Sequence, residues 1–246
     1  MFGMLASAGA VVAFALLGGC AGSSGTVREK TSQEWYDEGA LLAQKKSYDE
    51  ALEAFKEAAK GYRGADLDAD IQIALADAYF NKEEYPAAVE AYSEFLRLHP
   101  HNTRADYVQF RIGLSWQKQM RGPDRSPEPA RRTLAAFEAL VRGYPRSPLL
   151  EQGREGIVAA RRRLAEHELY VADFYRRTGK YIAAAGRYEV VLREYGDVGL
   201  AARVLYELGG CYRKLREQEK AEQYFDQLRR EYPQSRYAKD VEKAKG

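Results

Sequence analysis

A combination of residue types that recurs five times along this chain of 246 residues constrains the fold more than any other feature. Each copy has a small residue, then an Ala or Thr, and four positions later an aromatic residue. The copies are Gly39/Ala51/Phe55, Ala76/Ala88/Tyr92, Gly113/Thr133/Phe137, Ala172/Ala184/Tyr188 and Gly209/Ala221/Phe225. In four of them the first interval is twelve residues. Self-similarity of this kind predicts a stack of small structural units, which typically recognises other chains.

Each copy is expected to form two antiparallel helices. In the first copy Trp35, Gly39 and Leu42 share one helical face, and the small residue lets the two helix axes approach closely. Three of the copies end at a Pro, which cannot continue a helix. These residues are Pro100, Pro145 and Pro233. The spacing resembles the tetratricopeptide repeat, so the expected fold is an all-α solenoid of five tetratricopeptide-like helix pairs with a C-terminal capping helix.

The repeat domain is expected to occupy residues 32–246. Its predicted repeats cover about 32–65, 69–102, 106–147, 148–198 and 200–235. The third contains a longer interval and a Pro-rich loop at residues 121–129. From about Leu149 to Thr178 no Pro interrupts the pattern, which predicts one long helix of some eight turns. Gly153 and Gly156 mark either close packing or a break in that helix.

The N-terminus predicts export and lipidation. Residues 1–19 carry no charged side chain, and their apolar run is too short to span a bilayer, so they are expected to be a signal peptide. Leu17-Gly18-Gly19-Cys20 follows and resembles the lipobox of bacterial lipoproteins. That resemblance implies cleavage after Gly19, a lipid on the Cys20 thiol and, because Ala21 follows, delivery to the outer membrane. Residues 20–31 are then the lipidated Cys and a flexible tether rich in Gly and Ser.

Charge and residue patterns argue against several other functions. The chain has 38 basic and 36 acidic residues with finely alternating signs, which is not the basic face of a nucleic-acid binder. His99 and His101 have no third ligand near them in the sequence, so no metal site is expected. No phosphate loop, nucleophile elbow or distinctive carboxylate pair is present. We therefore predict a protein that is not an enzyme, has no catalytic residues and holds no cofactor besides the lipid on Cys20.

Several strings carry a more specific resemblance. They are Asp106-Tyr107-Val108, Asp124-Arg125-Ser126, Leu140-Val141-Arg142-Gly143-Tyr144-Pro145-Arg146-Ser147, and the helix from Arg163 to Ala172 with Phe174-Tyr175. With the lipobox, the five repeats and the extended fourth unit, the chain resembles the BamD family of outer-membrane protein assembly factors. Pro127-Glu128-Pro129 after the Asp-Arg-Ser string and Tyr195-Gly196-Asp197 depart from the family pattern, so the contacts of the third-unit loop are in doubt.

The resemblance implies a lipid-anchored protein on the periplasmic face of the outer membrane. Its partners would be the periplasmic domains of the insertase BamA, accessory assembly lipoproteins, and the C-terminal segments of unfolded outer-membrane proteins. In the family, an Arg early in the second helix of the fourth unit pairs with an acidic residue of BamA, and Arg187 occupies that place. A surface Arg paired with a local Glu is the other interpretation of Arg187.

Two further questions stay open at the level of sequence. Aromatic residues of the first helices, Tyr36, Phe80, Tyr107 and Phe110, would line a groove for a client peptide, or serve only as packing between repeats. The chain could also be another periplasmic repeat lipoprotein, such as a pilotin for pilus assembly or a coordinator of cell-wall synthesis.

Overall fold

The computed structural model describes residues 28–61 and 65–243. Within these ranges every regular element is a helix and no residue lies in a strand. The elements are α1 (Ser32–Gln44), α2 (Tyr48–Gly61), α3 (Ala65–Asn81), α4 (Tyr85–Leu98), α5 (Ala105–Lys118), α6 (Glu128–Gly143), α7 (Leu150–Arg177), α8 (Tyr181–Tyr195), the 3-10 helix η1 (Gly196–Val198), α9 (Ala201–Lys214), α10 (Gln218–Glu231) and α11 (Arg236–Lys243). Residue contacts group the chain into two units, and all these helices belong to Thr31–Gly246.

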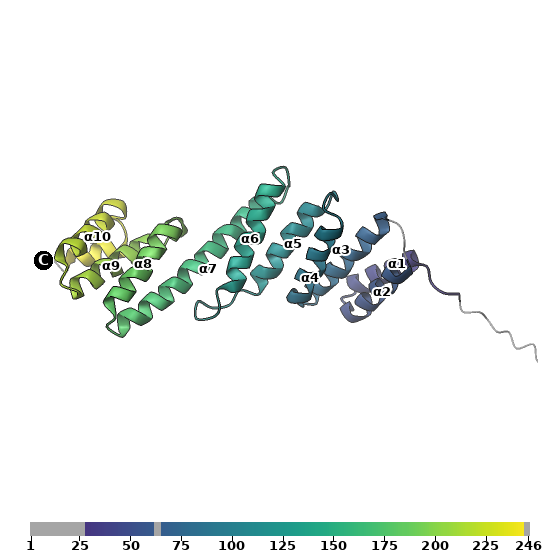
Figure 1. The fold of residues 1–246 in the computed structure, drawn as a ribbon, viewed down its shortest axis with the longest axis horizontal. Helices are drawn as coiled ribbons and strands as arrows, with labels where there is room; N and C mark the ends of the chain where they lie inside the picture. The colour runs from purple at the N-terminus through teal and green to yellow at the C-terminus, as the bar shows by residue number, and fades with distance from the viewer. Residues whose placement is uncertain (1–27, 62–64, 244–246) are drawn as a thin grey trace, which may run out of the picture. The chain divides into compact units, whose positions relative to one another are not determined.

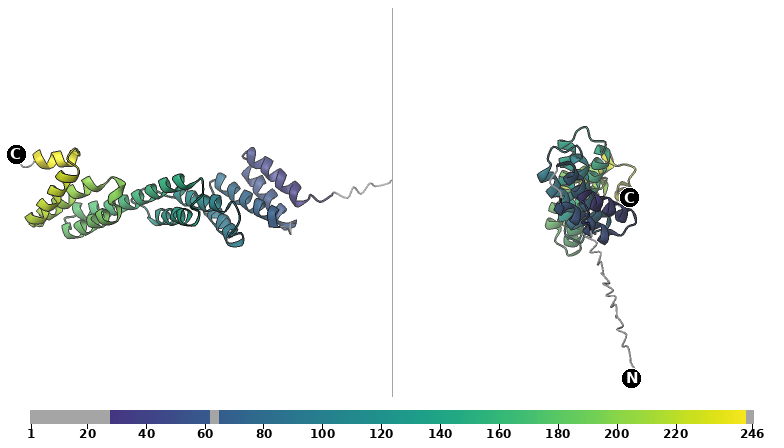
Figure 2. Two further views of the ribbon diagram at one scale, coloured as in Figure 1. Left: turned by 90° about the horizontal axis from the view of Figure 1, so that it is seen from above. Right: turned by 90° about the vertical axis from the view of Figure 1, so that its right-hand side faces the viewer.

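The helices stack in the order of the sequence. Each one from α1 to α10 packs against the next, so that five helix pairs follow one another, and the second helix of each pair also contacts the first helix of the following pair (Figure 1). The last helix, α11, packs against α9 and α10 at the C-terminal end (Figure 2). The all-α solenoid of five helix pairs with a capping helix, as predicted from the sequence, is confirmed.

Four of the five hairpins turn in the same way. Two residues after the first helix of the pair, the backbone enters the left-handed region at Lys46, Glu83, Gly179 and Arg216, with φ between 62° and 76°. The following amide then bonds back to a carbonyl of the helix that has just ended, as in Ser47 N to Leu42 O at 3.0 Å. Three of these positions hold a residue with a Cβ, which costs conformational energy there. The third hairpin lacks this turn because its loop is longer.

The small and aromatic residues of the repeat meet in every pair, and in two different ways. Three units place a Phe ring directly on a Gly of the first helix. A Cβ on Gly39, Gly113 or Gly209 would lie 2.7, 2.5 or 2.3 Å from a ring carbon of Phe55, Phe137 or Phe225 respectively. The other two units have Ala where these have Gly and Tyr where these have Phe: Ala76 with Tyr92, and Ala172 with Tyr188. All four of those side chains are fully buried.

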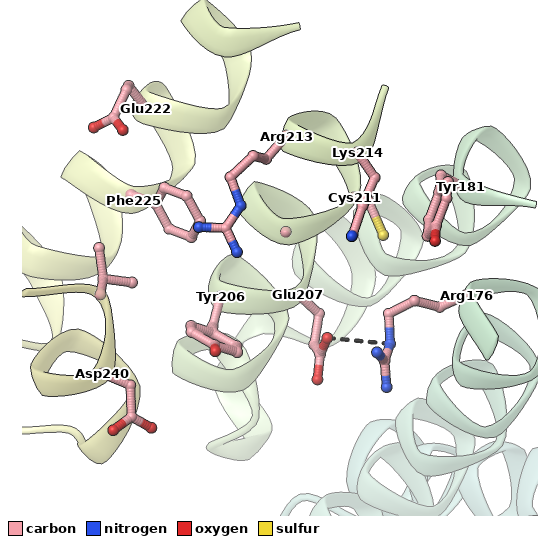
Figure 3. A pocket seen from close by; sticks show the side chains of 12 residues that line it. Arg176, Tyr181, Tyr206, Glu207, Cys211, Arg213, Lys214, Glu222, Phe225 and Asp240 are labelled. Carbon is pink, nitrogen blue, oxygen red and sulfur yellow. Dashed lines mark ion pairs between the residues drawn. The ribbon is translucent and has the colours of Figure 1, made fainter. Parts of the chain in front are cut away.

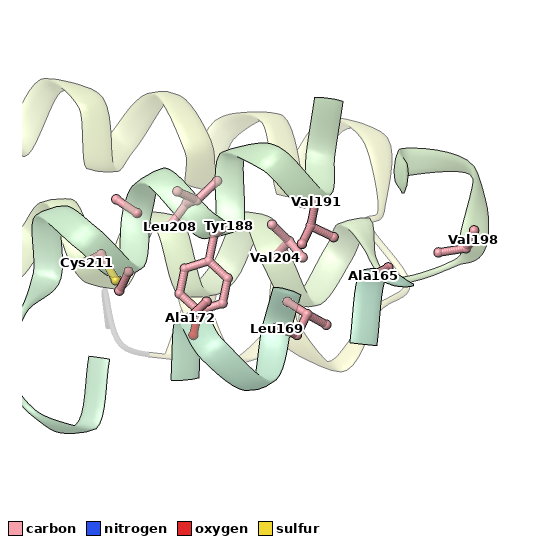
Figure 4. Packing of buried hydrophobic residues seen from close by; sticks show 11 residues of the cluster. Ala165, Leu169, Ala172, Tyr188, Val191, Val198, Val204, Leu208 and Cys211 are labelled. Atoms are coloured by element: carbon pink, nitrogen blue, oxygen red, sulfur yellow. The ribbon is translucent and has the colours of Figure 1, made fainter. Parts of the chain in front are cut away.

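The packing around Tyr188 illustrates how neighbouring pairs share one core. Figure 4 shows its ring between side chains of α7, α8 and α9. The buried cluster consists of Ala165, Leu169, Ala172, Ala184, Ala185, Tyr188, Val191, Val198, Val204, Leu208 and Cys211. Burial raises the pKa of the Cys211 thiol to about 11, so it serves as a small packing residue.

The fourth unit opens with one unbroken helix, as predicted. α7 runs through Gly153 and Gly156 without interruption for 28 residues. A Cβ on Gly153 would lie 2.9 Å from Leu140, and one on Gly156 would lie 2.2 Å from the ring of Phe137. Phe137 is therefore held between Gly113 of α5 and Gly156 of α7. The two glycines mark close packing between the third and fourth units, and not a break.

The long loop between α5 and α6 is also tied to α7. The Nδ1 atom of His167 lies 2.8 Å from the carbonyl oxygen of Pro123. Because a carbonyl only accepts, His167 Nδ1 carries the hydrogen in this bond. His167 therefore fixes the loop of the third unit against the helix of the fourth.

The crowding around Phe137 predicts opposite effects for two glycine substitutions. We expect Gly156→Ala to lower the free energy of unfolding by up to about 2 kcal/mol, because overpacking of about 1–3 kcal/mol offsets or outweighs a helix-propensity gain of about 1 kcal/mol. Gly186→Ala on α8 should instead stabilise the protein by up to about 1 kcal/mol, since a Cβ there meets no heavy atom within 4 Å. Urea unfolding followed by circular dichroism measures both, and equal stabilisation by the two variants would contradict the packing argument.

Candidate functional site

The sequence-predicted site residues fall into three places in the chain. Cys20 lies outside the described residues. The four aromatics expected in a client groove lie on α1, α3 and α5, and Arg187 lies on α8.

The aromatic set needs one correction. Phe110 is only 7 % exposed and packs on Phe137, with the ring centroids 5.7 Å apart. It belongs to the core of the third unit, because its ring lies in a buried cluster with Phe137 and Leu140 of α6. The ring of Tyr36 is half-buried and lies 5.9 Å from Phe55. Of the four residues, Tyr36, Phe80 and Tyr107 retain exposed surface.

Phe80 and Tyr107 lie beside a largely buried cation, Arg111. The guanidinium carbon of Arg111 lies 3.9 Å from the centroid of the Phe80 ring, and 5.6 Å from that of Tyr107. The Nη2 atom of Arg111 forms an ion pair with Asp77 Oδ1 at 3.1 Å. This arrangement combines a cation–π contact with a carboxylate partner, so the charge is compensated although little water reaches it.

Two tyrosines complete this cluster by donating to the same carboxylate. The hydroxyl of Tyr107 donates to Asp77 Oδ1 at 2.8 Å, and the hydroxyl of Tyr92 donates to the same oxygen. Tyr92 in turn accepts a hydrogen bond from Arg111 Nε at 2.8 Å. Burial first, and then the Asp77 charge, raise the pKa of both Tyr92 and Tyr107, so both phenols keep the proton that they donate.

The same arrangement recurs 96 residues later with different partners (77 to 173, and 92 to 188). Tyr188 donates to Asp173, which also pairs with Arg203. At the places of Phe80 and Arg111, however, the second copy has Arg176 and Glu207, which form an ion pair at 3.2 Å. At this pair of positions the cation therefore lies on the earlier first helix, α7, and the later one, α9, carries the carboxylate. Each copy ties two neighbouring repeats together by charge as well as by apolar packing.

Arg187 is at the surface and has a local partner. Its Nη1 atom donates to Oε2 of Glu168 on α7 at 2.9 Å. The side chain of Arg187 is 47 % exposed, whereas that of Glu168 is 17 % exposed. The interpretation as a surface Arg beside a local Glu therefore describes this structure. One contact leaves most of the guanidinium donors turned to solvent.

The surface of α8 around Arg187 is unusual for a helix in water. Ile182 is 75 % exposed, and Gly186 lies one turn after it on the same face. Ala183 and Arg187 form the neighbouring row, and both are exposed. Gly186 has no packing neighbour that would require its small size. The result is a flat apolar strip with a forked cation along one edge.

Comparison with known proteins decides the family. The YfiO family, described as outer membrane lipoprotein, matches residues 28–224. The chain belongs to this family. Together with the curated relatives that follow, this match confirms the resemblance to BamD that the sequence strings carry.

Two curated relatives of this chain are both named outer membrane protein assembly factor BamD. The outer membrane protein assembly factor BamD of Vibrio cholerae is 29 % identical over 205 residues, which is 79 % of this chain and 85 % of the relative. That of Neisseria meningitidis serogroup B is 30 % identical over 154 residues, or 58 % of each chain. Among solved structures, the TPR2AB domain in complex with pHSP90 of yeast Sti1 aligns with a TM-score of 0.49 at 14 % identity, covering 84 % of this chain and 80 % of that one.

The described residues contain neither a membrane-spanning helix nor a cluster of metal ligands. No helix among them is both long and apolar enough to cross a membrane. Over the same part of the chain, no group of three His, Cys, Asp or Glu side chains is placed to hold a metal ion.

Sequence reasoning missed the residues that organise these surfaces. No sequence pattern marked Asp77 or Arg111 as important, because the residues that each of them contacts lie on other helices. Glu168 was one of many acidic residues near Arg187. The available signal was the repetition of Asp one position after the small residue, with Tyr fifteen positions later, in the second and fourth units.

The network around Asp77 predicts a large effect for one carboxylate. Asp77→Ala should lower the free energy of unfolding by about 3 kcal/mol, because it leaves the largely buried Arg111 without a counter-charge. Asp70 provides a matched control on the same helix, since it also pairs with an Arg, Arg104 directly before α5, but both side chains are 42 % exposed. Asp70→Ala should cost at most about 1 kcal/mol. Equal losses in urea unfolding would show that Asp77 does no more than a surface partner.

Proposed function

We propose that this protein is a lipid-anchored scaffold for the assembly of outer-membrane proteins, working at the periplasmic face of that membrane through protein–protein interaction. Membership of the YfiO family and the BamD relatives support the assembly role. A stack of helix pairs supports the mode of action, because such stacks offer long surfaces to other chains. In this role the protein carries out no chemical step, and the lipid on Cys20 is the attachment to the membrane.

The docking site for BamA is proposed to be the α8 strip of Ile182, Ala183, Gly186 and Arg187. An exposed Ile beside a helical Gly is costly for a helix that faces water, but it suits a partner that packs closely against the backbone. Arg187 stands at the edge of the strip with free donors, and its planar fork fits a carboxylate in two parallel bonds. This exposed strip is the observation that carries the proposal.

The pair with Glu168 fits docking as well as it fits a purely local role. The less exposed Glu168 holds the Arg187 side chain above the strip and reduces the conformational freedom that would be lost on binding. A carboxylate of the partner could then join the remaining donors of the guanidinium without displacing Glu168.

For the client, we propose contact with the exposed parts of Tyr36, Phe80 and Tyr107. These rings lie on first helices of neighbouring pairs and are fixed by Phe55, Arg111 and Asp77 respectively. Rigid aromatic rings lose little entropy when an extended C-terminal segment of an unfolded outer-membrane protein packs on them. Accessory assembly lipoproteins would occupy other parts of the stack.

Docking through Arg187 is tested by charge reversal. Arg187→Glu should reduce the amount of BamA that co-purifies from detergent-solubilised membranes by about tenfold or more, because a carboxylate would then face both Glu168 and the acidic residue of the partner. The helical circular dichroism signal should not change. Restoration of the complex by an acidic-to-Arg substitution in BamA would assign the contact to that residue.

Glu168→Gln separates docking from the local ion pair. This variant removes the intramolecular charge partner while Arg187 keeps its own charge, so we expect BamA recovery to stay within about twofold of the unmodified protein. If Glu168→Gln and Arg187→Ala weakened recovery equally, Arg187 would act only through Glu168. Capture of a secretin or a cell-wall synthase in place of BamA would support the alternative periplasmic roles.

The anchor is tested by a substitution at the lipobox. Cys20→Ala should give a protein that lacks lipid by mass spectrometry and leaves the outer-membrane fraction, since two or more acyl chains are needed for stable attachment. A low-salt wash should leave some variant bound through BamA, and the double variant with Arg187→Glu should be fully released. Unchanged fractionation of the double variant would contradict the anchor.

A further inference from the structure

A pocket of about 250 Å³ opens where the fourth and fifth units meet the capping helix. It is lined by residues of α7, α8, α9, α10 and α11. Its apolar walls come from Tyr181, Tyr206, Phe225 and Val241. For comparison, a cavity of about 150 Å³ holds a benzene molecule. The pocket is therefore large enough for more than one side chain of a bound peptide.

Gly210 lines this pocket without any packing reason to be a glycine. A Cβ built there meets no heavy atom within 4 Å, whereas a Cβ on the preceding Gly209 would lie 2.3 Å from Phe225. The two adjacent glycines thus differ, since Gly209 is needed by the core and Gly210 is not. A glycine inside a helix costs about 1 kcal/mol against Ala, and its usual advantage is close approach of a ligand or backbone.

Gly210 can be compared with the residues at the equivalent position of the other repeats. The residue directly after the leading small residue is Asp77 in the second unit and Asp173 in the fourth, and each of these carboxylates accepts from a Tyr and pairs with an Arg. In the fifth unit the same position is Gly210. The first and third units have Ala40 and Leu114 there, so the fifth is the unit with no side chain at this position, and the pocket is open beside it.

Two cations stand beside that space. Figure 3 shows the side chains of Arg213 and Lys214 extending into the pocket, next to the Arg176–Glu207 ion pair. Within residues 28–61 and 65–243, no ion pair joins Arg213 or Lys214 to a carboxylate, and Arg213 lies over the Phe225 ring at 5.9 Å. The remaining acidic groups of the lining are Glu222, which pairs with Arg229 at 3.4 Å, and Asp240 of α11. The two cations Arg213 and Lys214 therefore exceed the one remaining carboxylate, Asp240, by one charge, which an added carboxylate would balance.

We propose that this pocket binds an Asp or Glu side chain of an extended partner peptide, with an apolar residue next to it in the peptide. The carboxylate would take the place that Asp77 and Asp173 fill in their units, and would accept from Arg213 and Lys214. The neighbouring apolar side chain would pack on Tyr206 and Phe225. This site is separate from the α8 strip and does not depend on BamA docking.

The test uses the full-length chain purified in detergent and a short labelled peptide. The probe is a fluorescein-labelled hexapeptide, capped at both ends, in which a single Asp lies between two Phe residues. We expect saturable binding in fluorescence anisotropy that weakens with added salt. The same peptide with Asn in place of Asp should bind at least about tenfold more weakly, because it loses the charge-assisted hydrogen bonds.

Variants at Gly210 distinguish this pocket from any other site. Gly210→Asp should abolish peptide binding, because it supplies the carboxylate from within the chain three and four positions before Arg213 and Lys214. Gly210→Leu should abolish binding by filling the space. Both should raise or preserve the unfolding temperature, since the new side chains meet open space. Lys214→Ala should weaken binding severalfold, whereas Arg230→Ala, a surface cation of α10 outside the pocket, should leave it unchanged.

Each result decides the proposal. Loss of binding in folded Gly210→Asp and Gly210→Leu, together with preference for Asp over Asn, supports it. Equal binding of the Asp and Asn peptides, no binding of either, or normal binding by Gly210→Asp overturns it. Binding of the Asn peptide only when its C-terminus is a free carboxylate overturns the choice of an acidic side chain in favour of a chain terminus.

Discussion

The contact between a small residue of one helix and an aromatic ring of the next is the constraint on which the rest of this structure depends. It sets the distance between the two helix axes in every pair, and it does so in two chemical forms. Gly lets a Phe ring lie directly on the helix backbone, as Gly39 does for Phe55. Ala goes with Tyr instead, as in Ala76 with Tyr92, and the phenol then reaches the carboxylate that follows the Ala. One choice of residue therefore decides whether a unit is closed by apolar contact alone or also by a polar network.

The polar form adds hydrogen bonds and ion pairs between repeats that the apolar form joins by packing alone. Asp77 accepts from a Tyr of its own pair and from the first helix of the following pair, so it can be satisfied only when both units are stacked in register. A slipped or partly folded stack would leave the Arg111 charge in a poorly hydrated place, which is expensive. The networks at Asp77 and Asp173 thus add specificity to an interface that small apolar side chains would otherwise define loosely.

Much of this architecture follows from the sequence, because the repeat fixes which residues face each other within a pair. The long helix was predictable from the absence of Pro between residues 149 and 178, and the packing role of Gly153 and Gly156 was one of two stated outcomes. The site was less accessible. Arg111 and Asp77 meet across 34 positions, and no periodicity of one helix predicts a contact between two helices. Phe110 was expected in a groove with Phe80 and Tyr107, but only the rotation of α5 against α6 shows that its ring turns to Phe137. The left-handed turns at Lys46, Glu83 and Arg216 were also not predictable, because the usual sequence signal for a positive φ is Gly.

The surfaces proposed for partners lie on elements that share one rigid helix. α7 supplies Glu168, which orients Arg187. About one and a half and two turns further on, it supplies Asp173 and Arg176, which pair with α9 beside the pocket. Its two glycines are both covered by side chains of the third unit, so they cannot act as a hinge. A partner at the α8 strip and a peptide in the pocket would therefore be held at a fixed separation. Their binding should influence one another through effective concentration when both belong to one chain, and not through a change in the shape of α7.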